Sequence, residues 1–114
     1  MTECPFCRIV AGDIPADVVY SDDSVLAFRD ISPQAPVHVL VIPRRHYADI
    51  AEVAAADPGL VGAMVAGAAA VAADLMPAGA GHRLIFNTGA DAGQTVFHAH
   101  LHLLAGATLG RAML

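Results

Sequence analysis

The sequence predicts a single α+β domain in which short strands surround one long helix. An apolar segment over residues 58–76 has the length and composition of a buried helix. Short segments rich in β-branched residues lie before and after it, and brief turns connect them, which is typical of a mainly antiparallel sheet. Because 114 residues are enough to bury one hydrophobic core, we expect one domain over residues 1–114.

The first half of the chain predicts a short helix followed by three strands. Residues 5–12 predict the helix. Two strands are expected within 18–30, with a turn at Asp22 between them. The third strand, 37–43, is rich in β-branched residues and ends at a proline, which lacks the backbone N–H that a strand needs.

The long helix begins at Asp57 and Pro58, an N-cap residue and a first-turn proline, and it ends before Pro77. It is uncharged over 58–73, but 16 residues are fewer than the ~20 that a membrane span needs. We therefore expect a buried helix and no membrane partner. Small residues let this helix lie flat on its own sheet or against a second subunit, and the sequence favours neither; these residues are Ala63, Gly67 and Ala70.

After the helix we expect a strand over 83–89, a glycine-bearing loop over 90–94 and a last strand over 95–104. Side chains alternate between the two faces of a strand. One face of the last strand then carries Val96, His98, His100, His102 and Leu104. The other face, expected to be core, carries Thr95, Phe97, Ala99, Leu101 and Leu103.

Three histidines at alternate positions of an apolar strand predict a functional site. Imidazoles are costly to bury unless they are hydrogen-bonded or bound to a ligand. An unperturbed pKa of about 6.5 lets histidine act as nucleophile, acid or metal ligand near neutral pH. Two chemistries fit the spacing, metal binding through His-x-His and nucleophilic catalysis at phosphorus, and the spacing alone does not separate them. The preceding glycine-bearing loop and the Thr95 hydroxyl offer hydrogen-bond donors to phosphate oxygens.

Net charge, the first ten residues and the cysteine spacing bear on the partners and the compartment of the protein. A net charge of −5 with six basic residues argues against a nucleic-acid partner. The first ten residues have neither a basic lead nor a long apolar run, so we expect no signal peptide and a cytoplasmic protein. In that compartment the spacing of Cys4 and Cys7 indicates a metal-binding or redox pair in preference to a structural disulfide.

The segment HAHLHLL, residues 98–104, matches the signature His-φ-His-φ-His-φ-φ, with φ hydrophobic, of the histidine triad (HIT) superfamily. With the further matches at 14–16, 26–46 and 87–106, the chain resembles the Hint branch, the nucleoside phosphoramidate hydrolases. The resemblance implies a homodimer of α+β subunits, each with a five-stranded antiparallel sheet, one long helix and one short helix. It also implies hydrolysis of purine nucleoside 5′-phosphoramidates, such as AMP–amine conjugates, through a nucleotidyl-histidine intermediate, with no cofactor required for the chemistry.

The resemblance assigns roles to individual residues. It implies that His100 is the nucleophile, that His102 contacts the phosphoryl oxygens and that His98 pairs with His38 in support, with Thr95 near the leaving group. The implied nucleotide-binding residues are Phe6, Phe28 and Ile31 around the base, Asp30 on the ribose, and Asn87, Gly93, Gln94 and Thr95 near the phosphate. Without the resemblance, the apolar members of this set would be core residues, and its aspartate and asparagine would be turn residues.

The two cysteines depart from the best-known Hint pattern and resemble bacterial members of the superfamily that bind a structural zinc. The implied ligands are Cys4, Cys7, His46 and His98, a sound tetrahedral set. A metal bound to His98 would argue against a supporting role of His98 in catalysis, and it would leave His100 free. Alternatives for the whole chain are a dinucleoside polyphosphate hydrolase or nucleotidyl transferase of the same superfamily, a non-catalytic nucleotide-binding module and a metal-dependent hydrolase.

Overall fold

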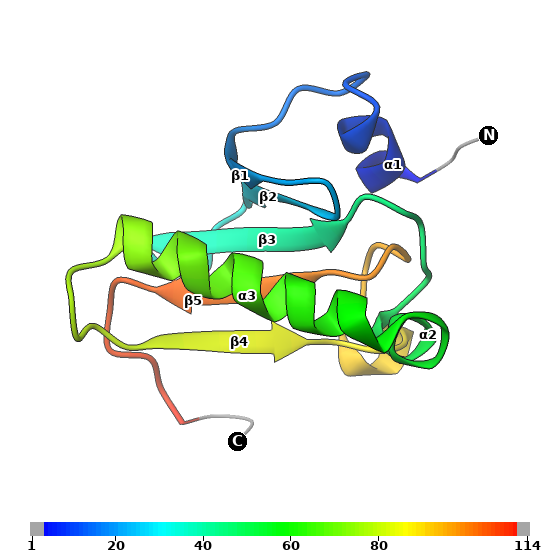
Figure 1. The fold of residues 1–114 in the computed structure, drawn as a ribbon. Coiled ribbons are helices and arrows are strands. Elements are labelled where there is room, and N and C mark those ends of the chain that lie inside the picture. Colours follow the sequence, from blue (N-terminus) through cyan, green and yellow to red (C-terminus); the bar gives the residue numbers. More distant parts are fainter. Residues whose placement is uncertain (1–3, 112–114) are drawn as a thin grey trace.

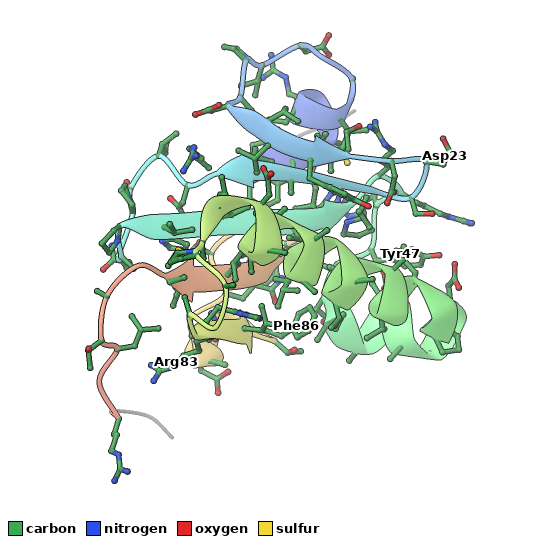
Figure 2. The ribbon with its side chains drawn as sticks, turned by 60° about the vertical axis from the view of Figure 1, so that its left-hand side comes forward. Asp23, Tyr47, Arg83 and Phe86 are labelled. Atoms are coloured by element: carbon green, nitrogen blue, oxygen red, sulfur yellow. The ribbon has the colours of Figure 1, made fainter. Side chains whose placement is uncertain are left out.

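A computed structural model describes residues 4–111 of the chain, so both ends of the predicted domain, 1–3 and 112–114, lie outside the described residues. In chain order the elements are α1 (Pro5–Val10), β1 (Val18–Ser21), β2 (Val25–Arg29), β3 (Val37–Pro43), α2 (Ile50–Ala56), α3 (Pro58–Leu75), β4 (His82–Phe86), the 3-10 helix η1 (Ala90–Ala92) and β5 (Leu101–Ala105). Asp23 lies at the tip of the turn that joins β1 to β2 (Figure 2).

The five strands form one antiparallel sheet in the order β1-β2-β3-β5-β4. This confirms the predicted fold class and the five-stranded antiparallel sheet. The long helix α3 crosses one face of the sheet and packs mainly on β3, β5 and β2, whereas α1 lies on the other side of β2, near the N-terminus (Figure 1). The strands β1 and β4 form the two edges of the sheet.

Alternating side chains of β2 and β3 divide the interior into two clusters, one on each face of the sheet. The cluster on the α3 face includes Val25, Ala27, Val39, Val41, Met64, Val71, Leu101 and Leu103, with Tyr47 and Phe86 packed into it (Figure 2). The cluster on the opposite face is built from Leu26, Phe28, Leu40 and Ile42, and it is closed by Phe6 of α1. Every second residue of β2 and β3 therefore points to the α1 side.

The helix α3 begins at Pro58 as predicted, with Asp57 as its N-cap residue. A Cβ atom at Gly67 would lie 3.2 Å from Val25 Cγ2, so this glycine lets α3 lie close to its own sheet. By length and composition alone, Pro58–Leu75 could also cross a membrane. Its inner face packs on the sheet, but only 33% of the segment is buried, so the predicted buried helix is confirmed for that face alone.

The predicted last strand begins later than expected. The β5 strand starts at Leu101, which pairs with Val41, so Ala99 would have to pair with Pro43, where β3 ends and no backbone N–H is available. The segment before Leu101 is held by other bonds, including one from Ala99 N–H to the Tyr47 carbonyl at 2.7 Å. The prediction that Thr95 and Phe97 are core is wrong: Thr95 is exposed, and Phe97 is 51% exposed.

The short helix α2 was not predicted, although its N-terminus has a recognisable signal. Asp49 is the N-cap residue, and its carboxylate accepts a hydrogen bond from Glu52 N–H at 2.9 Å. The Glu52 carboxylate in turn accepts from Ala48 N–H at 2.9 Å, which closes a reciprocal arrangement similar to a capping box. The domain therefore has a second short helix in addition to the predicted one.

Candidate active site

The three histidines of the motif lie on the sheet face opposite α3, as strand alternation predicts. The rings of His98 and His100 pack edge-on against Phe6 of α1, with centroid distances of 5.9 and 5.2 Å. The ring of His102 lies 5.0 Å from that of His100. Between them, Ala99 packs into the cluster under α3. Alternation of side chains thus continues through 98–102, although regular pairing begins only at Leu101.

His100 has the hydrogen bonding of a nitrogen nucleophile. Its Nδ1 lies 2.8 Å from the carbonyl oxygen of His98, and a carbonyl oxygen only accepts, so Nδ1 carries the proton. In the neutral ring Nε2 is then unprotonated and has a free lone pair. His100 is 7% exposed and lines a cavity of about 720 Å³. His98 therefore supports His100 through its backbone carbonyl.

A chain of hydrogen bonds fixes the tautomers of His38 and His102. Gln34 N–H donates to His38 Nδ1 at 3.0 Å, so the proton of the His38 ring is on Nε2. His38 Nε2 lies 2.9 Å from His102 Nδ1 and donates to it, which leaves the His102 proton on Nε2. His102 can therefore offer an N–H to a ligand in the cavity that it lines. The predicted pairing of His38 with His98 is wrong, because the partner of His38 is His102.

The His102 ring is neutral at pH 7. Burial, together with the neighbouring His100 and His38, lowers the pKa of His102 to about 4, whereas Asp30 acts in the opposite direction. A neutral ring keeps one N–H donor and one acceptor, which is what the chain from Gln34 through His38 requires.

Asp30 follows the last residue of β2 and lies close to the same histidines. Its Oδ2 lies 3.4 Å from His38 Nε2, and its Oδ1 accepts from Ser32 N–H at 2.8 Å. It therefore caps a turn and faces the site at the same time. Asp30, His38 and His102 also bring one metal-ligand atom each within 4.8 Å of one another. Since the Nε2–H of His38 is donated to His102, the Asp30 carboxylate lies beside this hydrogen-bonded pair and is not a further member of it.

The cavity beside His100 is lined mainly by apolar side chains, with a smaller number of polar ones. Its lining residues are Pro5, Phe6, Ile9, Ile14, Pro15, Ala16, Asp17, Phe28, Arg29, Asp30, Ile31, Leu40, Thr95, Val96, His100 and His102. Five of the predicted nucleotide-binding residues are among them, and Ile31 is 99% exposed at the rim. Asn87, Gly93 and Gln94 lie outside these walls.

Gln94 is buried and supports the loop before the histidines. Its amide Nε2 donates to the carbonyl oxygens of Ala48 and Val96 at 2.7 and 3.0 Å, and its Oε1 accepts from Gly89 N–H at 2.9 Å. Its backbone N–H donates to the Gly89 carbonyl at 3.1 Å. Since every N–H of Gln94 is engaged within the protein, the structure contradicts the predicted phosphate contact of Gln94. Gly93 has a φ of 98°, which suits a glycine at this turn.

The four predicted metal ligands converge on one point. Their ligand atoms lie within 4.8 Å of one another. The Nδ1 atoms of His46 and His98 are 3.2 Å apart, and the Cys7 Sγ lies 3.3 and 3.5 Å from them. A tetrahedral zinc with ordinary bond lengths needs about 3.4 Å between two nitrogens and about 3.6 Å between nitrogen and sulfur. The geometry of Cys4, Cys7, His46 and His98 therefore fits zinc.

The surroundings prepare these groups for a metal. His98 Nε2–H donates to the Pro43 carbonyl at 2.8 Å, which leaves Nδ1 free to bind. Burial lowers the pKa of His98, which favours the neutral ring that a metal requires. Burial and the neighbouring Cys4 raise the pKa of the Cys7 thiol to about 11, so a cation is needed to hold it as a thiolate at neutral pH.

Several residues of the site were not identified from the sequence. Gln34 takes part through its backbone N–H, for which a side-chain pattern gives no signal. Ile9 shares a cavity wall with Phe6, and their spacing of three on α1 is a signal that could have found it. Leu40 follows His38 on the same strand face and lines the cavity.

A five-stranded antiparallel sheet with three alternating histidines beside a pocket defines a histidine triad protein. The HIT domain matches residues 11–109, and the chain belongs to this family. The purine nucleoside phosphoramidase of Escherichia coli is 46% identical over 108 residues, 95% of this chain and 91% of that protein. An uncharacterised HIT-like protein of Synechococcus elongatus is 47% identical over 104 residues, 91% and 90% of the two chains. The structure of a HIT family hydrolase from Clostridium thermocellum superposes with a TM-score of 0.94 at 43% identity, covering 100% of this chain and 99% of the other.

Proposed function

We propose that this protein hydrolyses purine nucleoside 5′-phosphoramidates, that is AMP–amine conjugates, to the nucleoside monophosphate and the amine. The family and the 46% identity to a purine nucleoside phosphoramidase support this substrate class. The observation that carries the proposal is the His100 ring, whose Nδ1 proton is held by the His98 carbonyl while Nε2 is left unprotonated in a nucleotide-sized pocket.

In the first step His100 Nε2 attacks the α-phosphorus, and the bond from phosphorus to the amine nitrogen breaks. The nucleotidyl-histidine that forms carries a positive ring charge, which the His98 carbonyl stabilises through the Nδ1–H. The His102 Nε2–H donates to a phosphoryl oxygen on which negative charge accumulates. The leaving amine takes up a proton through the Thr95 hydroxyl, which passes it on from solvent water.

In the second step water attacks the same phosphorus, and the bond between phosphorus and His100 Nε2 breaks. The water proton is lost to solvent through the Thr95 hydroxyl, and AMP is released with the free imidazole regenerated. Because no group other than water is consumed, no cofactor is required for the chemistry. His38 is a positioning residue that keeps His102 in the donor tautomer.

The remaining pocket residues bind the nucleoside. Phe6 and Phe28 enclose the base, and Ile31 covers it at the rim. The Asp30 carboxylate accepts the ribose hydroxyls, since its Oδ2 is directed toward the site while Oδ1 caps the turn. Asn87 and Gly93 are proposed to support the phosphate loop from outside the pocket walls.

The cysteine and histidine cluster is proposed to hold a structural zinc. Cys4, Cys7, His46 and His98 fit a tetrahedral ion, and all four positions are supplied by the protein, so the site is closed to substrate. When bound, zinc would contribute to folding stability and take no part in the reaction.

We also propose a cytoplasmic homodimer without nucleic-acid or membrane partners. The outer face of α3 is apolar and exposed, and β4 is an unpaired sheet edge beside it. An uncharged helix face next to a strand edge is suited to a second copy of the same surface. The net charge of −5 argues against nucleic acid.

Turnover of an AMP–lysine or AMP–tryptamine conjugate tests the proposed reaction. We expect hydrolysis by the wild type, survival of activity after a short chelator treatment, and loss of turnover in His100→Ala. His82→Ala is the matched control, because His82 is exposed at the start of β4 and should retain wild-type rates. Turnover by His100→Ala would contradict the nucleophile, and AMP binding without turnover by the wild type would indicate a binding module instead.

A further inference from the structure

We propose that the metal at Cys4, Cys7, His46 and His98 sets the position of Phe6 and thereby couples metal binding to nucleotide binding. This inference rests on the proposed function only in taking an AMP-like nucleotide as the ligand of the pocket. Phe6 is then a positioning residue shared by two sites, as well as a wall of the pocket.

Phe6 lies between the two cysteines in the sequence and inside the nucleotide pocket in space. The Cys4–Cys7 turn is tightly closed, with Cys7 N–H donating to Cys4 Sγ at 3.2 Å and Arg8 N–H to the Cys4 carbonyl at 3.2 Å. Phe6 is 7% exposed and its ring contacts Phe28 edge-on at 5.5 Å. A shift of either cysteine therefore moves the aromatic wall of the pocket.

Phe6 also contacts a histidine of each site. Its ring is edge-on to the proposed metal ligand His98 and to the proposed nucleophile His100. The two histidines are linked as well through the backbone, since the His98 carbonyl accepts from His100 Nδ1. The Phe6 ring thus contacts a residue of the metal-ligand cluster and the proposed nucleophile, and it also forms part of the nucleotide pocket.

The pocket wall formed by α1, which includes Phe6, has few other contacts that hold it to the sheet. The helix α1 has six residues, too few to be stable alone in water, and it supplies Pro5, Phe6 and Ile9 to the pocket. Within residues 4–111, the hydrogen bonds that join α1 to the sheet side are those of the two cysteines with His46 and His98. Apolar packing of Phe6 and Ile9 provides the rest.

Metal binding replaces these weak thiol–imidazole contacts by four coordinate bonds, and the two thiol protons go to solvent. The wall is then held before the nucleotide arrives, so AMP no longer bears the entropic cost of ordering α1. By thermodynamic linkage, AMP must raise the affinity for the metal by the same factor. Couplings of this kind are typically about 5- to 150-fold.

Isothermal titration of AMP into zinc-loaded and metal-free protein under reducing conditions tests the coupling. We expect the wild type to bind AMP about 5- to 150-fold more weakly without zinc. Phe6→Ala should bind weakly in both states, with a zinc dependence below about twofold. Ile31→Ala is the matched control: it also removes a pocket wall, but its residue lies outside the metal cluster, so it should retain the wild-type zinc dependence.

If the metal-free protein does not fold, the coupling is measured from the loaded side by extracting zinc with a chromophoric chelator. AMP should then lower the extraction by a similar factor in the wild type and in Ile31→Ala, and have little effect in Phe6→Ala. Equal AMP affinity with and without zinc, equal extraction with and without AMP, or no zinc binding would overturn the coupling while leaving hydrolysis untouched. AMP binding with the expected zinc dependence but no turnover would refute the proposed reaction alone, and no AMP binding would refute both.

Discussion

Gln94→Ala should destabilise the protein strongly although Gln94 contacts no predicted catalytic group. Its buried amide makes three hydrogen bonds, to Gly89 N–H and to the carbonyls of Ala48 and Val96. At about 0.5–1.5 kcal/mol each, their loss amounts to about 1.5–4.5 kcal/mol, and at about 4 °C per kcal/mol for a chain of this length Tm should fall by about 6–18 °C. The loop that precedes the histidines loses its attachment to the segment before α2.

Chemical denaturation and a thermal melt at one fixed protein concentration measure this effect. The matched control is Gln34→Ala, which removes an exposed amide with a single bond to the Ser32 carbonyl and keeps the backbone N–H that serves His38. It should change the free energy of unfolding by less than about 0.5 kcal/mol. Gln94→Glu should also be destabilised, because a carboxylate cannot donate to the two carbonyls. A free energy of unfolding for Gln94→Ala as close to wild type as that of Gln34→Ala would refute the reasoning.

Three further predictions follow from the site and the surface. His38→Ala should lower kcat roughly 10- to 150-fold, because His102 would no longer be held as the donor to the charged phosphoryl oxygen, a hydrogen bond worth about 1.5–3 kcal/mol. His38→Gln keeps a donor near the Nε2 position and should retain more activity in steady-state kinetics. The pKa of His102 is depressed from 6.5 to about 4 in the folded state, so its stabilisation is fully present above pH 6.5 and is lost as pH falls toward 4; denaturant titrations should show this loss in the wild type and a smaller one in His102→Asn. Ala69→Glu, on the exposed face of α3, should give monomers in light scattering, whereas Ala54→Glu on α2 should not; a dimeric Ala69→Glu protein would contradict the proposed interface.

The sequence predicted directions of side chains better than it predicted pairing. Alternation placed His98, His100 and His102 on one face, because that depends only on a locally extended backbone. The start of β5 depends on the neighbouring strand β3. Because β3 ends at Pro43, the residues before Leu101 have no strand residues with which to pair. The helix α2 was missed although Asp49 and Glu52 form its N-terminal signal.

The partner of His38 depended on register, which a single sequence does not contain. In the sheet Leu40 pairs with His102 and His38 pairs with Leu104, so His38 and His102 are diagonal neighbours on one face. A register shifted by two residues would keep every face and every core residue type, yet it would bring His38 to a different histidine. The resemblance gave the residues of the site, but their hydrogen-bonding partners came from the strand register.

The tautomers explain why three similar histidines serve different purposes. His98 binds the Pro43 carbonyl through Nε2 and presents Nδ1 to the cysteines, whereas His100 binds a carbonyl through Nδ1 and presents Nε2 to the pocket. His102 accepts at Nδ1 from His38 and presents an N–H. In each ring one nitrogen is fixed by the protein, and the chemistry of the other follows from that bond. A substitution that removes one of these bonds, such as His38→Ala, therefore changes what the neighbouring His102 imidazole can do without removing that imidazole.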